Sequence, residues 1–360
     1  MKIANSVVIL GVALAAVTRC LAAAGPVPDG GPVGTIVVKD SLDRAVVVPR
    51  GARRIISIQP EISRMLVALG AGATLVGADY NLRLRDPLFK LVFPEEFRIP
   101  LVSMSENNVN QELVLSLKPD VIFVSPFERQ IVASLETKTR TPVVALASMG
   151  DFTKLAEEMT LLGRVLGREA RAAELVAYFN GTVARVRRTL GDLPANTKPR
   201  VYLAFWGSLT RTPLLYAPVT AAGGVNVAEK AVPDFLGSVQ TMVNVEQLLR
   251  WDPDIILVHG NYRPEERAVT PESVLKDPRL SATKAVRARH VYYTFGFWDW
   301  WDMAEVTLET MYLAHLFHPE KFPAYEMMKD GDAVIKMFYG VENVFAAFCR
   351  VLKCEDWAHD

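Results

Sequence analysis

The most unusual run of side chains that could bind a ligand is FGFWDWWD, at residues 295–302. Trp298 and Trp300 share one face if this run is extended, whereas Trp298 and Trp301 share one face if it is helical. Tryptophan offers a flat apolar surface and one N–H donor, which suits an aromatic chelator or a macrocycle. The same residues could instead fill the core beneath the helix that follows. The run therefore predicts either a ligand-binding surface or buried packing.

Catalytic signatures are missing from the sequence. It contains no G-x-S-x-G, H-E-x-x-H, C-x-x-C or G-x-x-x-x-G-K-[ST] motif. Of the five histidines, only His315 and His318 lie close together, three residues apart on an expected helix, and that spacing is more typical of packing than of a metal site. We therefore expect a protein that binds a ligand and carries no intrinsic cofactor.

Two short segments of the chain nearly repeat each other. VNQELVLSLKPDVIFV at 109–124 and VNVEQLLRWDPDIILV at 243–258 are identical at eight of sixteen positions. Asn110 and Asn244 can cap a helix, and Glu112 and Glu246 then lie in its first turn, where the helix dipole favours a carboxylate. The Pro-Asp pair ends the helix and leads into a buried strand. Capping explains the asparagine, but it explains less well why glutamate recurs in both copies.

The elements around these repeats alternate between strand and helix, which predicts an α/β fold. Strand-like runs such as PVVALA, VYLAFW, DIILVHG and HVYYTF are separated by helical patterns. Residues 151–192 differ, because they continue a helical pattern without proline until LGDLPANTKPR. We expect two Rossmann-like lobes, at 25–150 and 193–360, joined by a long bridging helical strut at 151–192, with terminal helices in the second lobe.

The N-terminus is typical of an exported protein. Residues 1–24 contain Lys2, an apolar run at 7–17 and a small-residue cleavage site, as in a signal peptide. Lipid attachment at Cys20 is the less favoured alternative, because Arg19 occupies a position where such sites have a small residue. The 40 basic and 40 acidic residues offer no electrostatic footprint for nucleic acid. We expect a periplasmic protein.

The two cysteines near the C-terminus, Cys349 and Cys354, could form a disulfide in an oxidising compartment. On a continuous helix their side chains would point to different sides. A disulfide therefore requires the helix to end between them; the alternative is two separate thiols.

The paired repeats, the strut and the exported N-terminus together resemble class III substrate-binding proteins of ABC importers, which serve ferric siderophores, cobalamin, haem and some metal or oxyanion ligands. RIISIQPEISRMLVALGAGATLVGAD, AGGVNVAEKA and WDWWDMAEVTLETMYLAHLFHPEKF also resemble segments of that family. One departure is Ser63-Arg64, where the family often has Thr-Glu. The resemblance implies a monomer whose Glu112 and Glu246 dock onto basic residues of a permease dimer in the inner membrane.

The resemblance also implies a ligand site between the lobes, at loops that follow the strands. These loops include Gln59-Pro60-Glu61, 103–108 and 127–129 from the first lobe. Arginines there could neutralise an anionic complex, and His259 with Tyr262 could ligate iron, although a histidine at a strand end is often structural. The candidate ligand-binding residues are Tyr80, Arg83, Trp206, Arg211, His259, Tyr262, Trp298 and Trp300, with Arg263 as a further arginine.

The expected cargo is an iron or cobalt chelate, such as a ferric siderophore or a corrinoid. A small oxyanion such as molybdate or tungstate in the same fold is the alternative, and it would need few aromatic residues. A ligand sensor that partners a membrane receptor would share the fold and the site. A metal-dependent enzyme without a recognisable motif is the least favoured reading.

Overall fold

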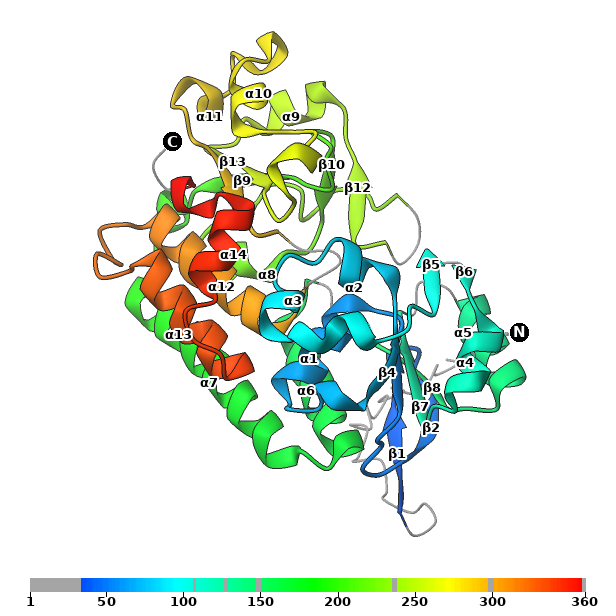
Figure 1. Ribbon diagram of the computed structural model, residues 1–360. Coiled ribbons are helices and arrows are strands. Elements are labelled where there is room, and N and C mark those ends of the chain that lie inside the picture. Colours follow the sequence, from blue (N-terminus) through cyan, green and yellow to red (C-terminus); the bar gives the residue numbers. More distant parts are fainter. Residues whose placement is uncertain are drawn as a thin grey trace, which may run out of the picture.

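The computed structural model describes residues 34–105, 108–125, 129–146, 150–234, 238–296 and 301–357. They form two α/β lobes, each built on a four-stranded parallel sheet, as predicted (Figure 1). None of the helices in these ranges is long and apolar enough to cross a membrane.

The first lobe contains a sheet in the order β4-β3-β7-β8. Its strands are nearly all buried on both faces, which is typical of a parallel sheet covered by helices. A β1–β2 hairpin and the short pair β5–β6 lie beside the sheet. The strands are β1 (Thr35–Lys39), β2 (Ala45–Pro49), β3 (Ile55–Ser57), β4 (Leu75–Ala78), β5 (Ser103–Ser105), β6 (Asn108–Val109), β7 (Val121–Val124) and β8 (Val143–Ala145). The helices are α1 (Pro60–Ala68), α2 (Tyr80–Leu84), α3 (Phe89–Val92), α4 (Gln111–Leu117) and α5 (Arg129–Thr139).

The second lobe repeats this plan with a sheet in the order β11-β9-β13-β14. The antiparallel pair β10–β12 lies beside it. Its strands are β9 (Arg200–Ala204), β10 (Arg211–Pro213), β11 (Val225–Asn226), β12 (Gln240–Met242), β13 (Ile255–His259) and β14 (Val291–Thr294). Its helices are α8 (Ala217–Ala221), α9 (Val245–Trp251), α10 (Pro271–Leu275) and α11 (Lys284–Arg287).

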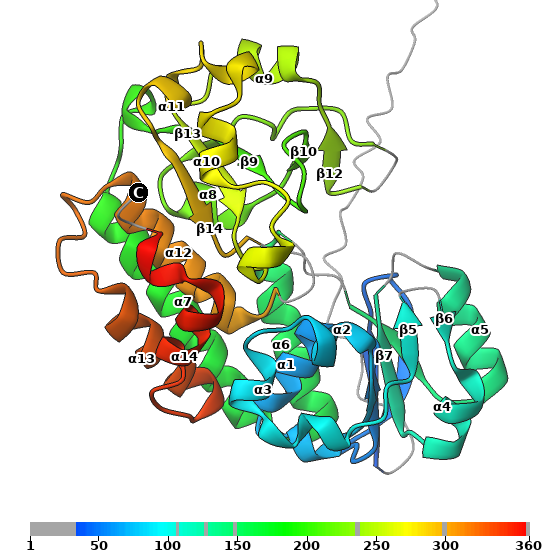
Figure 2. The same ribbon diagram turned by 45° about the horizontal axis from the view of Figure 1, so that its top comes forward.

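Two helices connect the lobes in the segment that the sequence predicted to be a helical strut. They are α6 (Phe152–Leu166) and α7 (Glu169–Leu190), and the left-handed residue Gly167 ends the first of them. The terminal helices α12 (Met303–Phe317), α13 (Met327–Tyr339) and α14 (Phe345–Leu352) lie along α7 on one side of both lobes (Figure 2). Because α13 also packs against α1, the end of the chain contacts the first lobe.

The hydrophobic core reflects this arrangement. One continuous cluster of buried side chains runs from the first sheet through α6 and α7 to the terminal helices and the second sheet. Two smaller clusters lie on the outer faces of the sheets. All nine residues of α1 are buried, including Glu61, Ser63 and Arg64. Buried ionisable side chains need hydrogen-bond or ion-pair partners, and the elements around α1 must supply them.

Candidate functional site at the lobe junction

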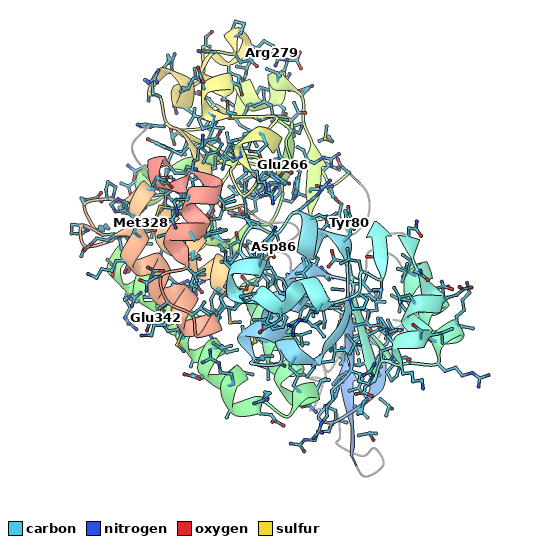
Figure 3. All side chains as sticks on the ribbon, in the orientation of Figure 1. Tyr80, Asp86, Glu266, Arg279, Met328 and Glu342 are labelled. Carbon is cyan, nitrogen blue, oxygen red and sulfur yellow. A yellow bond between two sulfur atoms is a disulfide. The ribbon has the colours of Figure 1, made fainter. Side chains whose placement is uncertain are left out.

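The first lobe brings three polar side chains to one edge of its sheet. Ala78 at the end of β4 pairs with Ser57 on one side and with Leu101 on the other. Residues two or three positions beyond these partners therefore lie side by side at the carboxyl ends of the strands. They are Gln59, Asn81 and Ser103, which are 7%, 5% and 1% exposed. Figure 3 shows Tyr80 at this edge, facing the second lobe.

The second lobe contributes the residues that follow β9, β13 and β14. His259 ends β13, and its Nδ1 accepts a hydrogen bond from the Trp206 amide at 3.4 Å. Its ring packs against Phe205 and Tyr262, with centroids 4.9 and 4.7 Å away. Burial lowers the pKa of His259 to about 3, so its imidazole is neutral at physiological pH. This packing favours the structural reading of His259 over iron ligation.

A buried ionic cluster centred on Arg64 joins the lobes. The Arg64 guanidinium donates two hydrogen bonds of 2.6 Å to Asp86 and one of 2.5 Å to Glu305. Asp302, the N-cap of α12, lies 3.6 Å from the same guanidinium and accepts a hydrogen bond from Tyr339. Burial is the largest influence on Glu305 and raises its pKa to about 8. The cluster therefore ties α1 of the first lobe to α12 through charges that are shielded from water.

Glu305 also reaches the second lobe. Its Oε1 accepts a hydrogen bond of 2.5 Å from Nδ2 of Asn261, two residues beyond β13. Gln59 is held in a similar way, because its Nε2 donates to Oε1 of Glu61. In both pairs a carboxylate fixes the amide nitrogen, so the amide oxygen faces elsewhere.

A second buried carboxylate lies farther along α12. Glu309 accepts hydrogen bonds from the hydroxyls of Tyr216 and Thr294 and from the amide of Phe295. Burial raises the pKa of Glu309 to about 7 despite these three donors. The contacts hold the segment after β14 against α12, where the tryptophan-rich run begins.

Arg267 positions the loop after β13. Its Nε donates to the carbonyl of Tyr262 at 3.0 Å, and its Nη2 donates to the carbonyls of Gly260 and Leu352. The guanidinium also lies 4.5 Å from the centroid of the Tyr293 ring. Arg267 thereby links the loop that carries Asn261 to the end of α14.

Besides His259, the predicted ligand-binding residues fall into two groups. Tyr80, Trp206, Arg211 and Tyr262 are half-buried. Nε of Arg211 lies 3.5 Å from the sulfur of Met242. Arg83 belongs to α2, but its side chain lies outside what the structure describes, as do Trp298 and Trp300. The described member of the tryptophan run, Trp301, is 1% exposed and packs against Tyr216, so it fills the core.

Arg64 and its carboxylates were missed as a site by sequence reasoning. The only signal was the departure at Ser63-Arg64 from the pattern that the resembling family often has. An arginine in an otherwise apolar helix needs a buried counter-charge, yet the sequence does not say which of many carboxylates supplies it.

The two repeated segments fold into matching helices, α4 and α9. Asn110 and Asn244 cap them, as predicted, by accepting hydrogen bonds from the amides of Leu113 and Gln247. Both helices have seven residues with the same order of exposed and buried positions, and both end at a left-handed residue before the proline. Glu112 and Glu246 are exposed at the second position of these helices.

The C-terminal cysteines are joined in the structure. α14 ends at Leu352, and Lys353 adopts a left-handed conformation, which brings the Cα atoms of Cys349 and Cys354 to 4.7 Å. A disulfide links their sulfur atoms. The helix therefore ends between the two cysteines, which is the condition that the sequence imposed.

Comparison with known proteins identifies relatives. The chain is 26% identical over 341 residues to the molybdate-binding protein MolA of Haemophilus influenzae, covering 84% of this chain and 90% of MolA. The structure of MolA bound to molybdate superposes with a TM-score of 0.73 at 22% identity, over 85% of this chain and 98% of that one.

Two further structures share the fold. A nickel–histidine complex of CeuE from Helicobacter pylori has a TM-score of 0.71 at 16% identity and covers 88% of this chain and 98% of CeuE. FeuA of Bacillus subtilis, a triscatecholate siderophore-binding protein with ferri-bacillibactin, has a TM-score of 0.62 at 17% identity and covers 79% and 99%. At these identities the structural likeness shows the fold alone.

The family itself is shown by the sequence. Residues 55–295, from the start of β3 to the residue after β14, match the periplasmic binding protein family. Members of this family are solute-binding proteins rather than enzymes, and they act outside the cytoplasm with ABC transporters. The chain belongs to the periplasmic binding protein family and is the substrate-binding protein of an ABC transporter.

Proposed function

We propose that this substrate-binding protein captures a metal chelate of iron or cobalt between its lobes and delivers it to a permease dimer, onto which it docks with Glu112 and Glu246. The observation that carries the docking part is the identical build of α4 and α9. Each lobe presents one exposed glutamate at the same position of the same helix. Two like surfaces suit a partner with two symmetry-related subunits.

The docking proposal is tested by charge reversal. Glu112→Arg combined with Glu246→Arg replaces both carboxylates by cations, which basic residues of a permease would repel. The expected result is loss of solute uptake with unchanged ligand affinity. The control is Glu157→Arg with Glu229→Arg, two exposed glutamates elsewhere, which change the net charge equally. Equal uptake by the two double variants would contradict the proposal that Glu112 and Glu246 contact the permease.

The ligand assignment rests on the aromatic side chains Tyr80, Trp206 and Tyr262 near the lobe junction, which suit an organic chelate. A second candidate is a small oxyanion such as molybdate or tungstate, which the similarity to MolA favours. Native mass spectrometry with elemental analysis of the exported protein separates them. A bound mass of several hundred daltons that contains iron or cobalt would support the chelate. A small adduct that contains molybdenum or tungsten would contradict it and support the oxyanion. A ligand sensor would bind the same solute without supporting its uptake.

Export is proposed to use residues 1–24 as a signal peptide that is removed in the periplasm. These residues lie outside the described part of the chain, so the argument is their sequence alone. Mass analysis of the exported protein tests it. A chain that begins near residue 25 is expected, and an acylated chain that begins at Cys20 would establish a lipid anchor instead.

A further inference from the structure

The residues that are identical in the two repeated segments fall into two classes. Eight positions of the segments 109–124 and 243–258 have the same residue. At six of them the residue has a structural role within its own lobe. At the other two the side chain is exposed, and the fold of the lobe does not explain why the residue recurs. These two positions hold Glu112 and Leu115 in the first lobe and Glu246 and Leu249 in the second.

Local structure requires the six residues of the first class. In each segment the asparagine caps the helix, the proline follows the left-handed residue that ends it, and the isoleucine and the second valine are buried in the strand. The first valine, Val109 or Val243, packs against the small cluster on the outer face of its sheet. Oδ2 of the aspartate accepts backbone hydrogen bonds, from the amides of Arg53 and Arg54 in the first lobe and from that of Arg200 in the second. Each of these identities therefore follows from the plan that the lobes share.

The recurring leucine is not explained in this way. Leu115 is 47% exposed and Leu249 is 36% exposed, and each is the fifth residue of its helix. At an exposed helix position lysine, glutamine or glutamate supports the helix about as well as leucine does. A single exposed leucine is common on protein surfaces, but here it recurs at the same place in both lobes. A contact outside the chain explains this recurrence, whereas the stability of the two helices does not.

The leucine and the glutamate form one surface in each lobe. They are three positions apart, so their Cβ atoms are neighbours on the helix surface, about 5–6 Å apart. The residue between them, Val114 or Leu248, is buried in the cluster beneath the helix. α4 and α9 belong to different lobes and lie apart in both ribbon views (Figure 1 and Figure 2). The molecule therefore presents two copies of one Glu–Leu patch, each made of a carboxylate and an apolar side chain.

We infer that Leu115 and Leu249 contact the two subunits of the permease, each through an apolar depression beside the basic group that binds the neighbouring glutamate. This inference rests on the proposed function, since it adds an apolar contact to each docking carboxylate. Two copies of one patch fit two symmetry-related subunits, because each subunit offers the same complementary surface. Salt screens the attraction of an exposed carboxylate, whereas burial of the leucine removes apolar surface from water at any salt concentration. The two recurring residues therefore supply two independent parts of one contact.

The test measures binding of the purified exported protein to the ABC transporter whose uptake depends on it, reconstituted in lipid nanodiscs. Leu115→Gln combined with Leu249→Gln removes both apolar groups, retains helix propensity and leaves the net charge unchanged. Met328→Gln combined with Val351→Gln is the matched control, because these residues of α13 and α14 are 40% and 38% exposed. Biolayer interferometry at low and at high salt gives the affinities, and thermal melts check that each variant is folded.

The leucine double variant is expected to bind the transporter at least about tenfold more weakly than the native chain, because two partly exposed leucines lose their burial in the complex. Each single leucine variant should show part of this loss, and the control should bind as the native chain does. The loss should be similar at low and at high salt. The loss caused by Glu112→Arg with Glu246→Arg should instead shrink as the salt concentration rises.

Unchanged binding of the leucine double variant, a loss confined to one of the two leucines, or a loss equal to that of the control would overturn the inference. So would self-association of the native chain that the leucine variants abolish in analytical ultracentrifugation, because it assigns the leucines to a second copy of the chain. The two proposals can fail separately. If only the glutamate variants lose binding, the inference is wrong and the docking glutamates stand; if only the leucine variants lose binding, the inference stands and the docking role of the glutamates is wrong.

Discussion

Replacing Arg64 by methionine should destabilise the whole protein, because it removes the one buried cation that described carboxylates share at the junction. Its guanidinium is fully buried and donates to Asp86 at 2.6 Å and to Glu305 at 2.5 Å. Methionine has a similar length but no charge. Asp86 and the nearby Asp302 would then remain buried without their counter-ion, and Glu305 would lose a hydrogen-bond donor.

The expected cost is about 3–5 kcal/mol in the free energy of unfolding, which is typical when one partner of a buried ion pair is removed. Arg50→Met is the matched control, since Arg50 pairs with Glu169 at 2.7 Å on the surface, where the side chains are 60% and 43% exposed. Such an exposed pair contributes about 1 kcal/mol or less. Both variants remove one arginine charge from an ion pair, so the difference between their costs reports the effect of burial.

Urea unfolding at pH 7, followed by circular dichroism and by tryptophan fluorescence, measures both variants. Lowering the pH should reduce the cost of Arg64→Met, because protonation of the carboxylates removes the uncompensated charge. The free energy of unfolding of Arg64→Lys should lie between those of Arg64→Met and the native chain, since lysine keeps the charge and loses the bidentate contact. A cost for Arg64→Met within about 1 kcal/mol of the Arg50→Met cost would refute this reasoning.

Three further predictions follow from local geometry. Cys349→Ser opens the six-residue disulfide loop and should lower the free energy of unfolding by about 2 kcal/mol, as should a reductant on the native chain. Between pH 4.5 and about 7 the folded chain keeps a proton on Glu309 that the unfolded chain releases, so the contribution of Glu309 to stability should fall by about 3 kcal/mol as the pH rises, and the difference between the native chain and Glu309→Gln in urea titrations should change by that amount. Gly296 and Gly207 share a φ of +67°, yet a Cβ on Gly296 would overlap the ring of His259, whereas one on Gly207 would be 3.7 Å from its nearest neighbour. Gly296→Ala should therefore lower the melting temperature more than Gly207→Ala; equal shifts would argue against the close packing.

The features that the sequence predicted well are local in the chain. Three of these features are the alternation of strands and helices, the asparagine caps of the repeated helices and the proximity of Cys349 to Cys354. All three depend on residues that are close together in the sequence. Local chemistry such as capping and turn formation determines them. The two-lobed arrangement was predicted from the same alternation and from the helical segment that interrupts it, and the two four-stranded sheets confirm it.

The junction could not be predicted in the same way. The partners of Arg64 are separated from it by 22 and 241 residues, and the sequence contains 40 acidic residues that could serve. Only the tertiary packing selects Asp86 and Glu305. Likewise, periodicity placed Trp301 on a face of a helix or strand without revealing whether that face is buried, and the core around Tyr216 decides it.

The contact between α1 and the terminal helices has a consequence for the timing of folding. Arg64 and Glu305 are 241 residues apart, and α13, which packs on α1, begins only at Met327. At a synthesis rate of about 5–20 residues per second, about 12–48 s pass between the emergence of one partner and that of the other. During this interval α1 lacks the part of its burial that α12 and α13 supply. The nascent first lobe therefore stays incomplete while the rest of the chain is made.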